Sequence, residues 1–525
     1  MKAKLGVYLT REVIKMLAKV LSFGLIGIEA YPVEIEIDVS NGLPAINLVG
    51  LLDASVKESK ERVKSAIKNS GFKWPRERIT INLAPSDIRK EGSCFDLAIA
   101  LGILSATCQI NSERLQNYYI LGELSLDGAV RPTKGILPIS IALSKSKIKN
   151  IILPSDNSKE ASIVSDICVW PIKTLRQAVE LLNSPEMFTP FKCDLQEILK
   201  NNYRYQVDFS EVKGQYYAKR ALEVAVSGGH NVLLIGPPGS GKTMLAKRIP
   251  TIMPDLTLEE MLEVTKIHSV AGNSPIREGI MTRRPFRHPH HSISNAALIG
   301  GGSIPKAGEI SLAHQGVLFL DELPEFRRDC LEALRQPLED SFIRISRANR
   351  SFLFPASFTL VCAMNPCPCG ALGQLKSACR CSTTQVYKYR SKISGPLLDR
   401  IDIHIEVPQA RYQELSSNLP AESSEQIKER VNKARGIQRE RFKNEGIFCN
   451  SQMSHKQIKK FCVLGKEEDE LLKMAMTELN FSARAYDKIL KVSRTIADLA
   501  ESEQIKTEHL SEAIQYRSLD REFFV

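Results

Sequence analysis

The chain has 525 residues, 43% hydrophobic and 25% charged, which is the balance of a soluble globular protein. This length corresponds to about three or four domains, each able to bury its own core. No apolar run approaches the roughly 20 residues that span a bilayer, and the first fifteen residues lack a signal peptide, so we expect no membrane partner and a cytoplasmic location. The formal net charge of +11 favours a polyanionic partner.

The first ~185 residues alternate between strand and helix patterns, as in one α+β unit. Val33, Ile35, Ile37 and Val39 are separated by acidic residues, which predicts a half-buried strand. The other elements expected in chain order are a strand over 45–49, a helix over 53–69, a strand over 79–83, an apolar helix over 95–106, a strand over 119–124, a hairpin turn at 127–128 and a helix from 136.

Two stretches of this unit, residues 90–96 and 122–132, resemble the Lon protease-like fold found in several ATPases. A Lon-type protease needs a Ser nucleophile and a Lys base. By alignment of these motifs, the two positions would fall on Cys94 and near Leu137. We therefore interpret the unit as proteolytically inactive, with a Cys94 nucleophile as the alternative to a cysteine that only packs.

The most specific pattern of the chain lies in residues 231–243. An apolar run over 232–235 predicts a buried strand, and a helix is expected to open at 242. The G-x-x-x-x-G-K-[ST] spacing between them is typical of a loop whose backbone N–H groups face a phosphate. The predicted nucleotide-binding residues are Gly236, Pro237, Pro238, Gly239, Ser240, Gly241, Lys242 and Thr243.

Lys242 would reach the β- and γ-phosphates of ATP, and the hydroxyl of Thr243 would bind Mg²⁺. A second apolar strand over 317–320 ends in Asp321 and Glu322. Acidic residues at the carboxyl end of such a strand lie where α/β sheets bind ligands. We expect Asp321 to be the Mg²⁺ partner and Glu322 the base that polarises the attacking water. Asn365, at the tip of a third strand, is the candidate that positions this water.

Together with residues 284–291, 300–302 and 308–316, these motifs resemble the AAA+ ATPases of the magnesium-chelatase group, and within it the ComM (YifB) family. The resemblance covers residues 16–525. It implies an ATP- and Mg²⁺-dependent hydrolase that forms a hexameric ring. It also implies a motor that migrates branched DNA during homologous recombination or transformation.

The resemblance further implies two arginines of the catalytic site. Arg400 would reach into the neighbouring subunit's site and stabilise charge in the transition state. The alternative is an ion pair of Arg400 within its own chain, with Asp399 or Asp402. Arg484, at the start of the last apolar helix, would contact the γ-phosphate from a lid, with Arg494 as the second choice.

The expected fold class is α/β, with an N-terminal α+β Lon-protease-like domain, a central AAA+ α/β domain and a C-terminal helical lid. The predicted boundaries are an extension over 1–15, an inactive Lon-like domain over 16–185, a linker over 186–210, the AAA+ core with its inserts over 211–408 and the lid over 409–525.

Two arginine-rich inserts are consistent with a protein that acts on DNA. Residues 342–355 are predicted to form a hairpin with Arg344, Arg347 and Arg350 near its tip, suited to gripping phosphates. Arg284 and Arg287 belong to a second basic segment, in which three histidines are also present. For those histidines a structural or phosphate-facing role is favoured over a metal site.

Four cysteines form a C-x-C-x₉-C-x-C pattern, namely Cys367, Cys369, Cys379 and Cys381. Four thiolates from two tight turns suit a tetrahedral Zn²⁺ ion. Buried reduced thiols or a redox-labile pair are the alternatives.

The patterns leave three functions open. The first is a DNA-dependent ATPase motor. The second is a chelatase-like or chaperone ATPase that remodels a protein partner, with the basic residues serving only solubility. The third, an active Lon-like peptidase, is disfavoured by the missing Ser/Lys pair.

Overall fold

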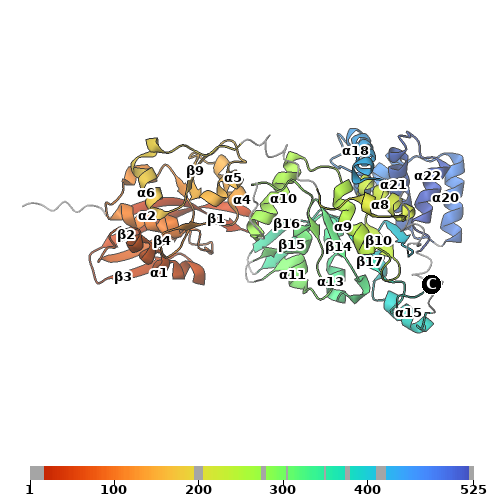
Figure 1. Ribbon diagram of the computed structural model, residues 1–525, viewed down its shortest axis with the longest axis horizontal. Coiled ribbons are helices and arrows are strands. Elements are labelled where there is room, and N and C mark those ends of the chain that lie inside the picture. The colour runs from red at the N-terminus through yellow and green to blue at the C-terminus, as the bar shows by residue number, and fades with distance from the viewer. Residues whose placement is uncertain are drawn as a thin grey trace, which may run out of the picture. The chain divides into compact units, whose positions relative to one another are not determined.

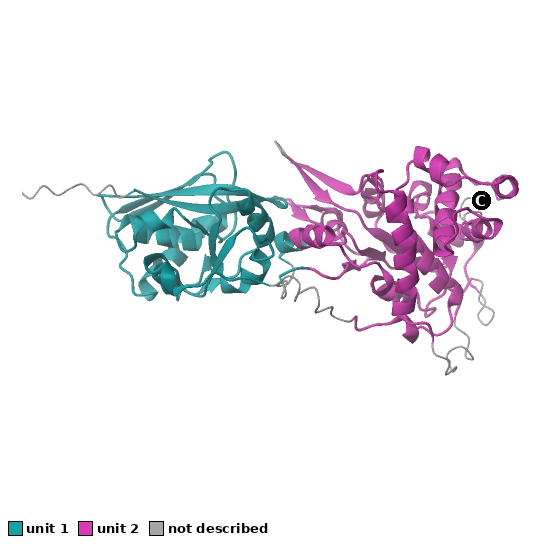
Figure 2. Ribbon diagram, turned by 90° about the horizontal axis from the view of Figure 1, so that it is seen from above, with its two compact units in different colours: residues 1–200, 268–280 teal, residues 201–267, 281–525 magenta. Residues whose placement is uncertain are grey.

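The structure is a computed structural model that describes residues 17–193, 205–272, 279–302, 305–347, 350–372, 379–409, 421–479 and 481–519. The chain divides into two compact units (Figure 2): unit 1 contains residues 1–200 and 268–280, and unit 2 contains residues 201–267 and 281–525. The expected extension over 1–15 lies outside the described residues, as do residues 194–204 of the expected linker. None of the helices in the described ranges combines the length and apolar character needed to cross a bilayer.

Unit 1 is built on a seven-stranded mixed sheet (Figure 1) in the order β3-β4-β2-β1-β5-β8-β9. β2 pairs antiparallel with β1 and β4, whereas β5, β8 and β9 run parallel. Val33 and Ile35 of β2 are fully buried, which confirms the predicted half-buried strand. The strands are β1 (Leu17–Ile26), β2 (Glu29–Ser40), β3 (Ala45–Val49), β4 (Arg78–Ala84), β5 (Tyr119–Ile120), β8 (Asn150–Pro154) and β9 (Cys168–Ile172).

Helices pack on both faces of this sheet. Ile152 of β8 belongs to the core that contains α2, whereas its neighbours Ile151 and Leu153 belong to the core that contains α4. Successive side chains of a strand point to opposite faces, so α2 and α4 cover opposite sides. The helices of unit 1 are α1 (Ala54–Asn69), α2 (Asp96–Ala106), α3 (Ser112–Leu115), α4 (Ile136–Ser144), α5 (Ser158–Ala161) and α6 (Leu175–Asn183).

The single strand expected over 119–124 is wrong. The chain forms β5, turns at Gly122 and then forms β6 (Glu123–Leu124), which pairs with β7 (Val130–Arg131). Gly122 has a φ of 159°, and a Cβ there would lie 2.7 Å from the side chain of Val130. The hairpin turn expected at 127–128 is confirmed, since it joins β6 to β7.

Unit 2 contains a five-stranded sheet in the order β11-β14-β17-β10-β18, with parallel pairing throughout. All four residues of β10 and of β14 are buried, as the apolar runs predict. The strands are β10 (Val232–Ile235), β11 (Phe286–Arg287), β14 (Val317–Leu320), β17 (Thr359–Met364) and β18 (Ile403–Glu406). The helices around them are α8 (Tyr216–Gly228), α9 (Lys242–Ile252), α10 (Leu258–Ala271), α11 (Asn295–Ile299), α12 (Glu309–Leu312), α13 (Arg328–Ala333), α14 (Arg335–Asp340), α15 (Thr383–Arg390) and α16 (Gly395–Leu398).

The C-terminal segment is helical, as expected. Its helices are α18 (Ser424–Arg441), α19 (His455–Phe461), α20 (Lys466–Glu478), α21 (Ala483–Leu499) and α22 (Thr507–Gln515). Val431 of α18 and Ile489 of α21 share one hydrophobic core with Val232 and Leu234 of β10. The C-terminal helices and the five-stranded sheet are therefore packed together.

Unit 2 also contains two short antiparallel ribbons. The predicted hairpin is confirmed as β15 (Phe342–Arg347) and β16 (Arg350–Pro355), in which positions 347 and 350 pair. The second ribbon joins β12 (Gly300–Gly301) to β13 (Lys306–Ala307). The glycines of β12 allow close approach of the backbones, since a Cβ on Gly300 would lie 2.3 Å from the carbonyl oxygen of Lys306.

Candidate functional site

The predicted phosphate-binding loop lies between β10 and α9, with the strand-loop-helix order that the sequence predicts. Gly239 and Gly241 have φ values of 75° and 92°, a conformation that side chains rarely adopt. Gly236 is required for a different reason, because a Cβ there would lie 2.1 Å from the carbonyl oxygen of Val407. The loop therefore leads directly into the N-terminus of α9, where free N–H groups favour an anion.

Lys242 joins the loop to the tip of β17. Its Nζ donates to the carbonyls of Gly236 and Pro237 at 2.7 and 2.9 Å, and to Oδ1 of Asn365 at 3.2 Å. Burial lowers the pKa of Lys242, although the nearby charges of Asp321 and Glu322 act in the opposite direction. The structure thus brings together the predicted phosphate lysine and the predicted water-positioning asparagine.

Thr243 and Asp321 meet at the same edge of the sheet. The Thr243 hydroxyl donates to Oδ2 of Asp321 over 2.7 Å. A hydroxyl and a carboxylate are both hard oxygen ligands, which suit Mg²⁺. Because β10, β17 and β14 are parallel neighbours, their carboxyl ends place Thr243, Asn365 and Asp321 along one edge. The residues present therefore fit the expected magnesium ion.

Glu322 follows β14 in a left-handed conformation with a φ of 55°. Its backbone N–H donates to Asp321 Oδ1 over 3.0 Å, and its Oε2 lies 3.3 Å from Nδ1 of His291. The carboxylate is about half exposed, and the His291 ring packs against that of His290, tilted by 35° with ring centroids 4.0 Å apart. The contact between His291 and the predicted base was not anticipated, although the histidine-rich segment marked the region.

Arg400 follows α16 and is held within its own chain. Its guanidinium forms an ion pair with Glu339 of α14 and donates to the carbonyl of Pro396 at 2.6 Å. The partner is thus neither Asp399 nor Asp402, the two that the sequence had offered. Within the described ranges, the Arg400 side chain forms no hydrogen bond or ion pair with Lys242 or with the other residues of the loop.

The two candidate sensor arginines of α21 have different environments. Arg484 is 62% exposed and pairs with Asp399 at 3.4 Å. Arg494 is buried, where it bonds Asp498 and the carbonyl of Glu503. Arg494 therefore holds the lid together, and Arg484 remains the candidate.

The predicted DNA contacts separate into two groups. Arg344 of β15 is exposed, whereas the side chains of Arg347 and Arg350 lie outside the described residues. Arg284 is almost fully buried and donates to the carbonyls of Pro254 and Gln315 at 2.6 and 2.7 Å. Arg287 forms a two-pronged ion pair with Glu309. The guanidinium N–H groups of Arg284 and Arg287 are thus bonded to groups of the same chain, and the two side chains do not form a surface that is free to bind phosphates.

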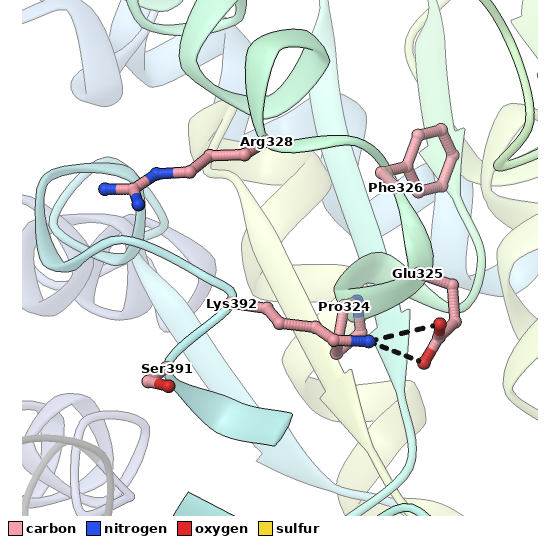
Figure 3. A pocket seen from close by; sticks show the side chains of 6 residues that line it. All are labelled: Pro324, Glu325, Phe326, Arg328, Ser391 and Lys392. Atoms are coloured by element: carbon pink, nitrogen blue, oxygen red, sulfur yellow. Dashed lines mark hydrogen bonds and ion pairs between the residues drawn. The ribbon is translucent and has the colours of Figure 1, made fainter. Parts of the chain in front are cut away.

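A groove of about 400 Å³ lies beside the segment that follows Glu322 (Figure 3). In the figure, Lys392 points toward Glu325, with which it forms an ion pair of 3.2 Å, whereas Arg328 points away from that pair. The residues that line the groove, Pro324, Glu325, Phe326, Arg328, Ser391 and Lys392, include none of the predicted site residues.

The four predicted cysteine ligands also come together. The sulfur atoms of Cys367, Cys369, Cys379 and Cys381 all lie within 4.8 Å of one another.

In unit 1, burial raises the pKa of the Cys94 thiol to about 12. This keeps Cys94 protonated at neutral pH, so it lacks the thiolate that a nucleophile requires.

Comparison with known proteins places this site in a family. The profile of magnesium chelatase subunit ChlI matches residues 208–415, and two related profiles of ChlI match residues 35–157 and, for its C-terminal part, 421–517. The chain is 45% identical to competence protein ComM of Haemophilus influenzae, over 96% of this chain and 98% of that protein. It is 42% identical to the protein YifB of Escherichia coli, over 94% of this chain and 96% of YifB.

A shorter similarity, 25% identity over 182 residues, connects the chain with Lon protease 2 of Bacillus subtilis and covers 31% of this chain and 32% of that protease. The α/β fold with its Lon-like, AAA+ and helical lid parts is thereby confirmed. The chain belongs to the ComM/YifB family of magnesium-chelatase-like AAA+ ATPases, which carry a Lon-like N-terminal domain.

Proposed function

We propose that this protein is a DNA-dependent ATPase motor that couples ATP hydrolysis to DNA translocation or branch migration, in homologous recombination or transformation. The observation that carries the ATPase half is the meeting of Lys242 with Asn365, and of Thr243 with Asp321, at the sheet edge where Glu322 also lies. These are the groups that phosphoryl transfer to water requires.

In the proposed reaction, the loop N–H groups and Lys242 bind the β- and γ-phosphates. Mg²⁺, when bound by Thr243 and Asp321, neutralises phosphate charge. Glu322 accepts a proton from the attacking water, and Asn365 orients that water toward the γ-phosphorus. As the bond between the γ-phosphorus and the bridging oxygen breaks, the negative charge that builds up on the β-phosphate of the departing ADP is balanced by Lys242.

The site is completed between subunits in this proposal. Arg400 would leave Glu339 and reach the γ-phosphate of a neighbour's ATP in a hexameric ring, while Arg484 would approach the phosphate from the lid of its own chain. A trans arginine is worth about 10³–10⁵ in rate in other NTPases.

DNA is the proposed load because two features favour it. The chain carries a formal charge of +11, and the β15–β16 hairpin presents the exposed Arg344. The Haemophilus relative is named a competence protein, which agrees with a role in processing DNA. In this proposal the hairpin grips phosphates, and so it adds affinity without base specificity.

The test compares ATP turnover without DNA, with single-stranded DNA and with a branched junction. We expect both DNAs to stimulate turnover, and Arg344→Ala to reduce the stimulation and lower the slope of log affinity against log salt by about one. Lys433→Ala is the matched control, because it removes another exposed positive charge, from the lid. Absence of stimulation and of salt-sensitive DNA binding would favour a motor that remodels a protein partner.

Unit 1 is proposed to serve as a scaffold without peptidase activity, because Cys94 and Leu137 stand where a Lon-type protease has its Ser and Lys. We also propose a cytoplasmic location. All twelve cysteines lie in the described part of the chain, and none of them forms a disulfide there, which fits a reducing compartment.

A further inference from the structure

The four-cysteine cluster has the dimensions of a site for one metal ion. Three sulfur pairs are 3.4, 3.6 and 3.6 Å apart, namely Cys367 with Cys369, Cys367 with Cys379, and Cys369 with Cys379. Sulfurs placed about 2.3 Å from a central zinc in a tetrahedron would lie about 3.8 Å apart. The observed spacing is therefore close to that of a ZnS₄ centre.

The alternatives fit these distances less well. A disulfide needs two sulfurs about 2.05 Å apart, and the nearly equal spacings single out no pair for such a bond. Backbone N–H groups also point at the sulfurs: those of Ala371 and Arg380 donate to Cys369, and that of Cys381 donates to Cys379. Backbone donors of this kind orient ligand atoms around a metal ion.

Two segments carry the four cysteines: a first arm, residues 365–372, and a second arm, residues 379–390. The first arm begins at the predicted ATP site. Asn365, which accepts from Lys242, stands two residues before Cys367. Gly370, which directly follows Cys369, lies against Pro238 of the phosphate-binding loop. A Cβ on Gly370 would lie 2.5 Å from Pro238 Cδ, and the φ of 76° adds strain for any other residue.

The second arm also contacts the backbone beside Asn365. Cys381 is followed by Ser382, which caps α15 in a reciprocal capping box with Gln385. From the end of α15, Arg390 Nε donates to the carbonyl of Pro366 over 3.3 Å. The neighbouring Tyr389 hydroxyl is hydrogen-bonded to the backbone of Asn365. Both arms, residues 365–372 and 379–390, thus begin or end beside Asn365.

We propose that Cys367, Cys369, Cys379 and Cys381 bind one Zn²⁺ ion, and that this ion ties the two arms together and so holds Asn365 and Pro238 in position for ATP. The zinc half of the proposal stands on the cluster alone, whereas the coupling half rests on the proposed ATPase activity. Loss of the metal frees the arms, so Asn365 and the loop lose their support without losing any group that contacts ATP.

The metal is tested first, by elemental analysis of the full-length chain purified under reducing conditions. We expect about one zinc per chain, and essentially none in Cys379→Ser/Cys381→Ser. Cys108→Ser/Cys168→Ser is the matched control, since it removes two exposed thiols of unit 1 and should keep the zinc. A wild-type chain with little zinc, or with iron in its place, would overturn the zinc site. Stripping the wild-type chain with a mercurial and restoring zinc gives the same test without a substitution.

The coupling is tested by binding of a fluorescent ATP analogue and by the ATPase rate at several ATP concentrations. We expect the zinc-free chain to lose about tenfold to a hundredfold in kcat/KM, and added zinc to restore it. Gly370→Ala should lose a similar factor while keeping its zinc, because the new methyl group displaces Pro238. Unchanged ATP affinity and turnover in both chains would overturn the coupling. A wild-type chain that holds zinc but hydrolyses no ATP would instead refute the proposed function and leave the zinc site standing.

Discussion

Asp402 is the buried charge that joins β18 to the lid, and its removal provides the sharpest test of the fold. Its Oδ1 lies 2.6 Å from Nζ of Lys488 on α21, and its Oδ2 accepts from the Asn231 N–H at 3.1 Å. The imidazole Nδ1 of His230 lies 3.5 Å from the same Oδ2. Burial alone would raise the pKa of Asp402, but the charge of Lys488 and the hydrogen bonds hold that pKa well below its usual range.

Asp402→Asn keeps the shape of the side chain and removes its charge. Lys488 is only 15% exposed, so an unpaired ammonium would be left inside the protein. Breaking a buried pair in this way costs about 3–5 kcal/mol. Amide exchange across α21 should then become faster by about a hundredfold to a few thousandfold, if exchange follows local opening.

The pH dependence identifies the cause. Burial lowers the pKa of Lys488 to about 8 even with Asp402 beside it, so without Asp402 this pKa falls further. The unfolded chain keeps its lysine protonated up to about pH 10, and therefore the folded variant gains stability as the pH rises and Lys488 releases its proton. The difference between variant and wild type should be largest at about pH 5–7 and smaller at pH 9.

Hydrogen exchange followed by mass spectrometry suits this measurement, because both tryptophans lie in unit 1 and would not report on the lid. Rates are corrected for the intrinsic pH dependence of exchange. Asp487→Asn is the matched control on the same helix, since its pair with His455 is exposed and should change exchange by less than about tenfold. Equal rates for the two variants at pH 6, or a difference that does not shrink by pH 9, would refute the reasoning.

Three further predictions concern catalysis. Glu322→Gln should keep ATP binding and lower phosphate release by about 10²–10⁴-fold; an unchanged rate would contradict its role as the base. His291→Ala removes the 3.3 Å contact with Glu322, which frees the carboxylate, and basal turnover should rise above that of the control His290→Ala; a fall would show that His291 supports the reaction instead. Arg400→Ala mixed with Lys242→Ala should recover some turnover, since an intact arginine can then serve an intact loop; no recovery at any mixing ratio would indicate a defect confined to one chain.

Local patterns predicted the parts of the site that depend on neighbours in sequence. Gly236 to Thr243, and Asp321 with Glu322, stand at the ends of strongly apolar strands, and that placement follows from strand polarity alone. The partners of side chains could not be predicted in this way. The contacts of Arg400 with Glu339 and of His291 with Glu322 connect positions 61 and 31 residues apart, and no periodicity records them.

Arg284 shows the same limit from the opposite side. In the sequence it is one of several basic residues in a segment typical of phosphate binding. In the fold its guanidinium is enclosed and bonded to backbone carbonyls, and burial lowers its pKa. Charge counting cannot separate an arginine that closes gaps between loops from one that faces a ligand, because the difference arises only from tertiary packing.

In a single chain, Glu339 is the counterion of Arg400, the arginine that a ring would present to the neighbouring subunit's ATP. If Arg400 acts on a neighbour, each new subunit contact must exchange one carboxylate for one phosphate. An isolated subunit would then be slow even with ATP bound, and turnover per chain would rise with protein concentration. The Glu339 pair would thus set a threshold in protein concentration. Below it the subunits hydrolyse little ATP, because no ring has formed.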